Sequence, residues 1–209
     1  MLLYYITDRA QFPGDEVARR HRLLDKIGEA VACGIDLVQL RGKDLCARQL
    51  ETCAREAAAM VREQPAGRTR LLINSRSDVA LACGADGVHL RSDDVCAREA
   101  RLIWRSIPDH KPGVIGVSCH SPAEVRHAQV AGADFAVFGP VFEKKNASAE
   151  GMGLAALRQA CASRIPVLAL GGVTLENARA CVDAGAAGIA AIRLFQENKI
   201  AEVVRRLRD

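Results

Sequence analysis

The segment Gln39-Leu-Arg-Gly-Lys43 ends an apolar run and carries polar side chains at alternate positions. If the run is a strand, alternation places Gln39, Arg41 and Lys43 on one side of it. Arginine offers a planar fork of donors and lysine a point charge, a pair suited to pyrophosphate. The segment therefore predicts a pyrophosphate clamp, with a rim of ion pairs to Asp44 as the alternative.

Two further apolar runs end in groups that suit a hard metal ion. Asn74 ends one run, and Asp93 and Asp94 follow the run that contains His89. Because Mg²⁺ bound through substrate phosphates needs only one or two protein carboxylates, these residues predict a magnesium site. As an alternative, one of the aspartates caps the next helix. His89 alone is more typical of a core histidine.

A serine and a histidine, Ser118 and His120, stand at the end of another apolar run. Ser121 and Glu124 just after them have the spacing of a capping box, so Ser121 is expected to be structural. Ser118 and His120 then remain available for substrate contact or proton transfer. Cys119 between them is expected to fill space at the mouth of the site.

The stretch over residues 139–153 is the longest irregular segment and is rich in glycine and charge. It predicts a loop that brings a cation, Lys144 or Lys145, over the site; a solvated loop is the alternative. The pair Gly171 and Gly172 would let backbone N–H groups approach an anion, which predicts a phosphate site near them.

A repeated phrase predicts the elements that position these residues. A glycine that can end a helix precedes a short apolar run at residues 34, 84, 132 and 185, at intervals of 50, 48 and 53 residues. Each interval is about twice the length of one strand–helix unit. Four more strands are expected between them: Leu2–Thr7, Leu71–Asn74, Val114–Ser118 and Pro166–Leu170.

Eight strands alternating with helices predict a single (β/α)8 TIM barrel, an α/β fold, as one domain over residues 1–209. In such barrels the active site lies at the C-terminal ends of the strands, which is where the polar residues above are found. Strand eight ends at Ile192 and Arg193, so these two residues are expected beside the same mouth.

Composition argues against several other classes of protein. The net charge of +4 is scattered and aromatic residues make up 4%, so no nucleic-acid surface is expected. The sequence has no apolar run of membrane-spanning length and no signal peptide, which predicts a cytoplasmic protein without a membrane partner. The eight cysteines form no CxxC pair and are expected to be reduced structural thiols. The sequence does not determine whether the protein forms a homo-oligomer.

Together the motifs resemble the thiamine-phosphate synthase family, which includes the related thiazole tautomerases. The resemblance runs from about residue 3 to 195. It is carried by Tyr5-Ile-Thr-Asp8, Gln39-Leu-Arg-Gly-Lys43, Leu72-Ile-Asn74, Gly84-Ala-Asp-Gly-Val-His-Leu90, Gly116-Val-Ser-Cys-His-Ser121, Phe138-Gly-Pro-Val-Phe142 and Leu170-Gly-Gly-Val-Thr174. It implies condensation of hydroxymethylpyrimidine pyrophosphate with hydroxyethylthiazole phosphate, with Mg²⁺, to thiamine phosphate and pyrophosphate.

The resemblance also implies roles for single residues. Positions that match contacts to the pyrimidine pyrophosphate are Gln39, Arg41, Lys43, Asn74 and Ser118. Asp94 matches a magnesium ligand, with Asp93 beside it. Gly172 and the backbone near Ile192 match the cradle of the thiazole phosphate, and Arg193 stands where a serine is expected.

Departures from the family pattern keep two alternatives open, a thiazole tautomerase and a non-catalytic barrel that binds a phosphate ligand. Ser75 replaces an aspartate, and Arg91-Ser92 replaces a Gly-Gln pair. The loop that begins Val-Phe-Glu is closer to the tautomerase branch, in which a histidine at the position of His120 transfers a proton. The Arg41 and Lys43 pair favours the synthase, since a tautomerase needs no pyrophosphate site.

Overall fold

Eight parallel strands close into a barrel in the order β1 to β8, and β8 pairs with β1. The computed structural model describes residues 1–64, 69–108, 112–143 and 151–209. The strands are β1 (Leu2–Ile6), β2 (Leu37–Leu40), β3 (Arg70–Asn74), β4 (Gly87–Leu90), β5 (Val114–Cys119), β6 (Phe135–Phe138), β7 (Val167–Leu170) and β8 (Gly188–Ala191). The predicted (β/α)8 TIM barrel is confirmed, and the four strands predicted between the repeats are correct to within one residue at each end.

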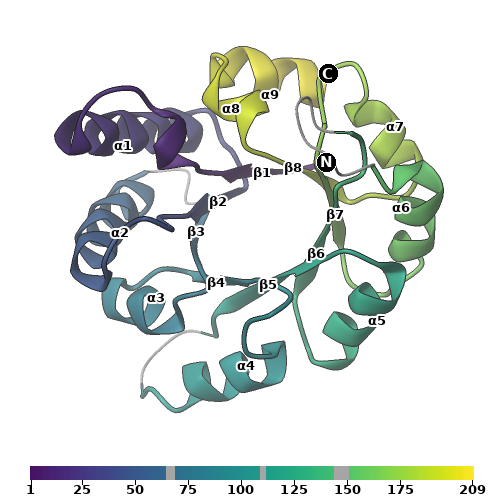
Figure 1. Cartoon of the computed structure of the whole chain (residues 1–209), viewed down its shortest axis with the longest axis horizontal. Coiled ribbons are helices and arrows are strands. Elements are labelled where there is room, and N and C mark those ends of the chain that lie inside the picture. The colour runs from purple at the N-terminus through teal and green to yellow at the C-terminus, as the bar shows by residue number, and fades with distance from the viewer. Residues whose placement is uncertain (65–68, 109–111, 144–150) are drawn as a thin grey trace.

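The helices form a ring outside the barrel (Figure 1). They are η1 (Arg9–Gln11), α1 (Glu16–Ala32), α2 (Ala47–Arg62), α3 (Ser77–Cys83), α4 (Ala97–Arg105), α5 (Pro122–Val130), α6 (Gly153–Cys161), α7 (Ala178–Asp183), α8 (Arg193–Gln196) and α9 (Ile200–Arg208). Polar caps begin several of them: the Asp15 carboxylate accepts the N–H of Ala18 at 2.9 Å, and the Ser121 hydroxyl accepts the N–H of Glu124 at 3.1 Å. Within the described part of the chain, no helix is both long and apolar enough to cross a bilayer.

Two apolar layers hold the barrel together. A small layer fills the lumen with side chains that alternate along the strands, such as Tyr4 and Ile6 of β1 and Phe135 and Val137 of β6. A larger layer lies between the strands and the helices. Because each strand is buried on both faces, the strands are continuous apolar runs in the sequence.

The four repeated glycines adopt the left-handed conformation that was predicted for helix ends. Their φ angles are +73° at Gly34, +66° at Gly84, +82° at Gly132 and +102° at Gly185. A side chain at these angles would be strained, so glycine fits these turns best. The repeat in the sequence therefore corresponds to a repeated turn at the N-terminal end of the barrel.

An aspartate two residues after three of these glycines joins neighbouring strands. We call Asp36, Asp86 and Asp134 the aspartate clamps. Their carboxylates accept backbone N–H groups of the preceding strand, from Leu3 at 2.8 Å, Leu71 at 2.8 Å and Ile115 at 2.7 Å. Their own N–H groups bond the carbonyl oxygens of those same three residues. The fourth repeat has Ala187 at this position, which bonds only the carbonyl oxygen of Val167, at 2.9 Å.

Removing a clamp should cost measurable stability. Asp36→Ala leaves the N–H of the fully buried Leu3 without its acceptor, and we expect the free energy of unfolding to fall by about 1–3 kcal/mol. Urea unfolding measures this. Arg208→Ala is the control, because it removes the ion pair of Arg208 with Asp36 at 3.1 Å and the hydrogen bond to the Gly34 carbonyl oxygen at 2.7 Å and leaves the Asp36 carboxylate in place to accept the Leu3 N–H. An equal loss in both variants would assign the effect to the ion pair instead of the clamp.

Candidate active site

Polar side chains replace the apolar layer toward the C-terminal end of the lumen. The Gln39 Nε2 donates to the Tyr4 hydroxyl at 2.9 Å, and this hydroxyl lies 3.1 Å from His89 Nδ1. On the other side of the imidazole, His89 Nε2 lies 2.8 Å from Ser118 Oγ. We call these four residues the lumen chain. Gln39 points into the lumen as alternation predicted, and Ser118 also takes part in the lumen chain.

Burial keeps the two central groups of the lumen chain neutral. Tyr4 is fully buried, which raises the pKa of its phenol far above the ordinary value, with a smaller opposing effect of the hydrogen bond from Gln39. Burial also lowers the pKa of His89 to about 4, although the nearby charge of Asp94 acts in the opposite direction. Near neutral pH the phenol therefore keeps its proton and the imidazole carries only one.

Arg41 lies just beyond the end of β2 and is fixed by β1 and the residues after it. Its N–H donates to Thr7 Oγ1 at 3.0 Å, and its guanidinium lies 3.4 Å from the Asp8 carboxylate. Its side chain is 22% exposed, so the guanidinium remains open to a ligand. The predicted rim of ion pairs exists with a different carboxylate, because Asp44 pairs with Arg9 instead.

Lys43 is exposed in the turn that follows β2. The strand ends at Leu40, so alternation no longer determines the direction of a side chain three residues later. Lys43 makes no ion pair with any residue that the structure describes. Its predicted place beside Arg41 in a clamp stays a prediction.

Sequence reasoning missed the residue that holds Asp8. Gln196 of α8 accepts the Asp8 N–H at 3.0 Å and donates to the Asp8 carbonyl oxygen at 2.9 Å. Its Oε1 also accepts the Tyr5 hydroxyl at 3.1 Å. Gln196 thus positions Asp8 and, through it, Arg41. The available signal was weak: a glutamine next to a buried phenylalanine, far from Asp8 in the sequence.

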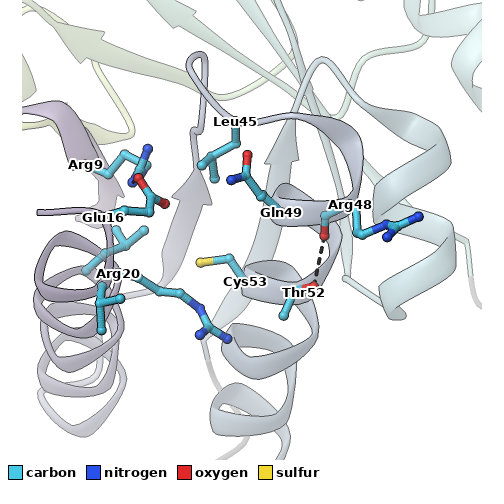
Figure 2. A pocket seen from close by; sticks show the side chains of 10 residues that line it. Arg9, Glu16, Arg20, Leu45, Arg48, Gln49, Thr52 and Cys53 are labelled. Atoms are coloured by element: carbon cyan, nitrogen blue, oxygen red, sulfur yellow. Dashed lines mark hydrogen bonds and ion pairs between the residues drawn. The ribbon is translucent and has the colours of Figure 1, made fainter.

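Arg9 ties the loop that carries Lys43 to the first helix. It is buried and forms ion pairs with Glu16 of α1 and Asp44 of the β2–α2 loop. Arg9 lies at one end of a cavity of about 290 Å³ between α1 and α2, where the Cys53 sulfur faces the gap between the helices (Figure 2). None of the residues that sequence predicted for the site lines this cavity.

The end of β3 has an unusual backbone. Ser75 has φ +61°, the one positive φ among the described residues other than glycine. Its N–H bonds the carbonyl oxygen of His89 at 2.8 Å, and its hydroxyl accepts the Asn74 Nδ2 at 3.0 Å. The turn therefore holds Asn74 at the end of β3, next to β4.

Arg91 binds both aspartates of the predicted metal site. The Asp94 carboxylate accepts the Arg91 N–H at 2.7 Å and its guanidinium at 3.3 Å, and Asp93 lies 3.1 Å from the same guanidinium. The prediction that one aspartate caps the next helix is wrong. Cys96 begins α4 instead, in a capping box with Glu99. In the part of the chain that the structure describes, no cluster of three metal-binding side chains occurs.

His120 is exposed at the end of β5, and its ring has a defined orientation. Its Nδ1 lies 2.7 Å from the carbonyl oxygen of Gly139, which can only accept, so Nδ1 carries the proton. Its Nε2 is then left as a base. The N–H of His120 donates to Glu124 at 2.7 Å, so the predicted cap around Ser121 also holds the histidine.

Gly171 and Gly172 are required by the loop that packs on them. They have φ +94° and +64°, and a Cβ would lie 2.6 Å from Pro140 Cα at the first and 2.7 Å from the Glu143 carbonyl oxygen at the second. This close approach of the loop explains both glycines without an anion, so their predicted phosphate contact stays a prediction.

Ile192 and Arg193 lie where β8 passes into α8. Ile192 is the N-cap of α8, and Arg193 is exposed at the first position of the helix. Both are at the C-terminal end of the barrel, as predicted from the order of the strands. Lys144 and Lys145, predicted to supply a cation, lie outside the described residues.

All eight cysteines are free thiols, as predicted. Cys119 is buried in the layer between barrel and helices and not at the mouth, which corrects the expected position. Burial raises the pKa of the Cys119 thiol to about 12. Cys119 is therefore a packing residue in the outer layer.

Comparison with known proteins gives a consistent result over nearly the whole chain. Residues 3–195 match the family model described as thiamine monophosphate synthase. The chain is 38% identical over 213 residues to the thiamine-phosphate synthase of Methanoculleus marisnigri, covering 99% of this chain and 93% of that protein. It is 36% identical over 200 residues to the thiamine-phosphate synthase of Clostridium novyi, covering 94% and 91%.

Among solved structures, the chain resembles the thiamine phosphate pyrophosphorylase from Pyrococcus furiosus. The TM-score is 0.82 at 31% sequence identity, over 99% of this chain and 93% of that one. The barrel of 3-hexulose-6-phosphate synthase, at 17% identity and a TM-score of 0.64, shares the fold. The similarity therefore includes both the sequence and the arrangement of the barrel.

Proposed function

Because this chain belongs to the thiamine monophosphate synthase family, we propose that it is a thiamine-phosphate synthase. This transferase joins hydroxymethylpyrimidine pyrophosphate to hydroxyethylthiazole phosphate and releases pyrophosphate. The observation that carries the proposal is the open guanidinium of Arg41 at the barrel mouth, beside the polar lumen chain. A tautomerase would have no use for a second anion site at this place.

The reaction requires stabilisation of a leaving group. The C–O bond to pyrophosphate breaks with both electrons on the oxygen, and the thiazole nitrogen then forms a C–N bond to the pyrimidinylmethyl cation. Arg41, Lys43 and the Ser118 hydroxyl would donate to the pyrophosphate oxygens as negative charge develops on them. The Asp8 carboxylate lies 3.4 Å from the Arg41 guanidinium, beyond ordinary hydrogen-bond length, so the guanidinium fork can turn to a ligand.

In this proposal the thiazole phosphate binds at a separate part of the barrel mouth, beside β7 and β8. Gly171 and Gly172 follow β7, and Ile192 and Arg193 follow β8, so these four residues surround the position proposed for the thiazole phosphate. Arg193 is exposed and can supply the charge there. The barrel then holds the two substrates side by side, and proximity supplies part of the rate.

The residues beside β4 suit Mg²⁺ in kind, since Asp94 with Asp93 provides the one or two carboxylates that the ion needs besides phosphate oxygens. A bound Mg²⁺ would neutralise pyrophosphate charge. Asp94 is 13% exposed and Asp93 69% exposed, so both carboxylates can be reached from the mouth. Arg91 competes for these same oxygens.

Removal of that competing cation should tighten metal binding. We expect Arg91→Gln to bind Mg²⁺ several-fold more tightly in the presence of inorganic pyrophosphate, because both carboxylates lose their ion pair with the guanidinium. Isothermal titration calorimetry measures this directly. Arg179→Gln is the control, because Arg179 pairs with Asp183 on the exposed face of α7. Unchanged Mg²⁺ affinity in Arg91→Gln would argue against metal binding at Asp93 and Asp94.

The second candidate function is a thiazole tautomerase, and His120 favours it. The Gly139 carbonyl oxygen fixes the proton on Nδ1, which leaves Nε2 as a base at an exposed strand end. A proton taken from one carbon of a carboxythiazole phosphate could be returned at another by the same nitrogen.

One assay separates the candidates. Purified protein is incubated with both synthase substrates and Mg²⁺, and thiamine phosphate and pyrophosphate are measured. Formation of both products, lost in Arg41→Ala and Asp94→Asn, supports the synthase. If neither forms, but a carboxythiazole tautomer is converted and His120→Ala abolishes this, the tautomerase is correct. Binding of a phosphorylated ligand without either reaction would identify a non-catalytic barrel.

A further inference from the structure

The hydrogen bonds of the lumen chain have a direction that its first member sets. Gln39 Nε2 can only donate, so the Tyr4 oxygen accepts at this contact of 2.9 Å. The phenol has one proton, and its remaining neighbour in the chain is His89 Nδ1 at 3.1 Å. Donation of this proton to Nδ1 satisfies both groups, and it requires Nδ1 to be without a proton.

The same direction continues to the mouth. A neutral imidazole without a proton on Nδ1 carries it on Nε2, which donates to Ser118 Oγ at 2.8 Å. Because Ser118 Oγ accepts the hydrogen bond from His89 Nε2, the hydroxyl proton of Ser118 can be donated to a different acceptor. Ser118 lies near the C-terminal end of β5, so this proton is available to a ligand at the mouth.

The reverse direction is the competing possibility. If Nδ1 of His89 carried the proton, Nε2 would accept from Ser118, and the serine would turn its proton inward. The mouth would then present a lone pair of Ser118 to an anion, which is unfavourable. The burial of Tyr4 and His89 supports a chain of neutral groups, in which only the positions of the protons distinguish the two directions.

We propose that Tyr4 is a positioning residue, which holds His89 as the Nε2–H tautomer and thereby points the Ser118 proton at an oxygen of the leaving pyrophosphate. The identity of the ligand rests on the proposed synthase function, whereas the tautomer of His89 does not. Gln39 then acts inside the barrel, as the donor that gives the chain its direction. This role differs from the pyrimidine contact that the family resemblance implies.

The tautomer is tested by NMR of the protein with ¹⁵N-labelled histidine. Two-bond ¹H–¹⁵N correlations distinguish the tautomers, and a His89→Gln spectrum identifies the His89 signals among the five histidines. The wild type should show a proton on Nε2 of His89 only. Tyr4→Phe should show a mixture of both tautomers, because Nδ1 has lost its donor. A wild-type proton on Nδ1, or an unchanged Nε2–H signal in Tyr4→Phe, would overturn the proposal.

A second variant tests the same tautomer by changing Gln39, the first residue of the lumen chain. Gln39→Met removes the donor to Tyr4 and keeps the phenol, so His89 should again show both tautomers. Tyr5→Phe is the matched control: it also removes a buried phenol hydroxyl from β1, but one that donates to Gln196 in the outer layer. The His89 signals should not change in Tyr5→Phe. A His89 tautomer unaffected by both Tyr4→Phe and Gln39→Met would contradict the proposal.

Calorimetry with inorganic pyrophosphate tests the consequence for the ligand. Ser118→Ala should weaken pyrophosphate binding by about 10- to 100-fold, the effect of losing one hydrogen bond to a charged group. Tyr4→Phe should weaken binding by only about twofold, because the binding-competent tautomer of His89 remains in part of the protein, and it should cause no further loss when combined with Ser118→Ala. Additive losses would show that Tyr4 does not act through Ser118. A wild type that forms no thiamine phosphate would contradict the synthase and leave the tautomer result intact.

Discussion

Arg41→Ala is expected to lower kcat/KM for the pyrimidine pyrophosphate by about two to three orders of magnitude, the loss typical of removing one preorganised donor. The end of β1 and the residues after it hold Arg41 at the mouth, through Thr7 and Asp8. The Arg41 guanidinium would donate to pyrophosphate oxygens whose negative charge grows as the C–O bond breaks. This interaction is stronger in the transition state than in the bound substrate, so kcat should fall more than KM rises. Steady-state kinetics with the pyrimidine substrate varied measures both.

Two further variants show whether the loss comes from the charge and shape of the Arg41 side chain or from the removal of any arginine. Arg41→Lys keeps the charge and loses the fork, so an intermediate loss of about tenfold is expected. Arg179→Ala removes an arginine that pairs with Asp183 far from the strand ends, and full activity is expected. If Arg41→Ala retained nearly all activity, pyrophosphate would not be bound at this position, and the proposed role of the mouth would be wrong.

Gly171→Ala is expected to destabilise the protein by about 2–5 kcal/mol. The change places a side chain at φ +94°, and its Cβ would lie 2.6 Å from Pro140 Cα. The first effect costs about 1–2 kcal/mol, and overpacking against a backbone atom adds about 1–3 kcal/mol. The 139–143 loop should shift, and with it the carbonyl oxygen of Gly139 that holds His120. Urea unfolding gives the change in stability.

Gly132→Ala separates the two effects. Gly132 has φ +82°, and no heavy atom lies within 4 Å of the place that a methyl group would occupy, so an alanine there is strained but does not clash. We expect it to cost about 1–2 kcal/mol and to leave the His120 signals in an NMR spectrum unchanged. If both variants lost the same stability, the contact with Pro140 would contribute nothing, and the loop would not depend on Gly171.

The barrel could be predicted because its signals are local and repeated. Each helix-ending glycine at residues 34, 84, 132 and 185 needs only its own turn to be interpreted, and the spacing then gives the number of strands. Alternation likewise predicted that Gln39 points inward, since it lies within a strand. These predictions depend on secondary structure alone.

The site was less predictable because its partners come from distant parts of the chain. Tyr4 and His89 are 85 residues apart, and Asp8 and Gln196 are 188 apart, so no local pattern joins them. Predictions were also weaker beyond the strand ends. Lys43 lies in a turn, and Arg91 binds Asp93 and Asp94 through a loop geometry that strand periodicity does not describe.

The missing fourth aspartate clamp makes the barrel unequal around its circumference. Ala187 has no side-chain oxygen to accept the N–H of Val167, so β7 and β8 are joined by one side-chain contact fewer than the three clamped pairs. This seam is where thermal opening of the sheet should begin. Gly171 and Ile192 lie at the C-terminal ends of the same two strands, β7 and β8. A phosphorylated ligand that contacts both residues would therefore oppose separation of the two strands and stabilise the barrel.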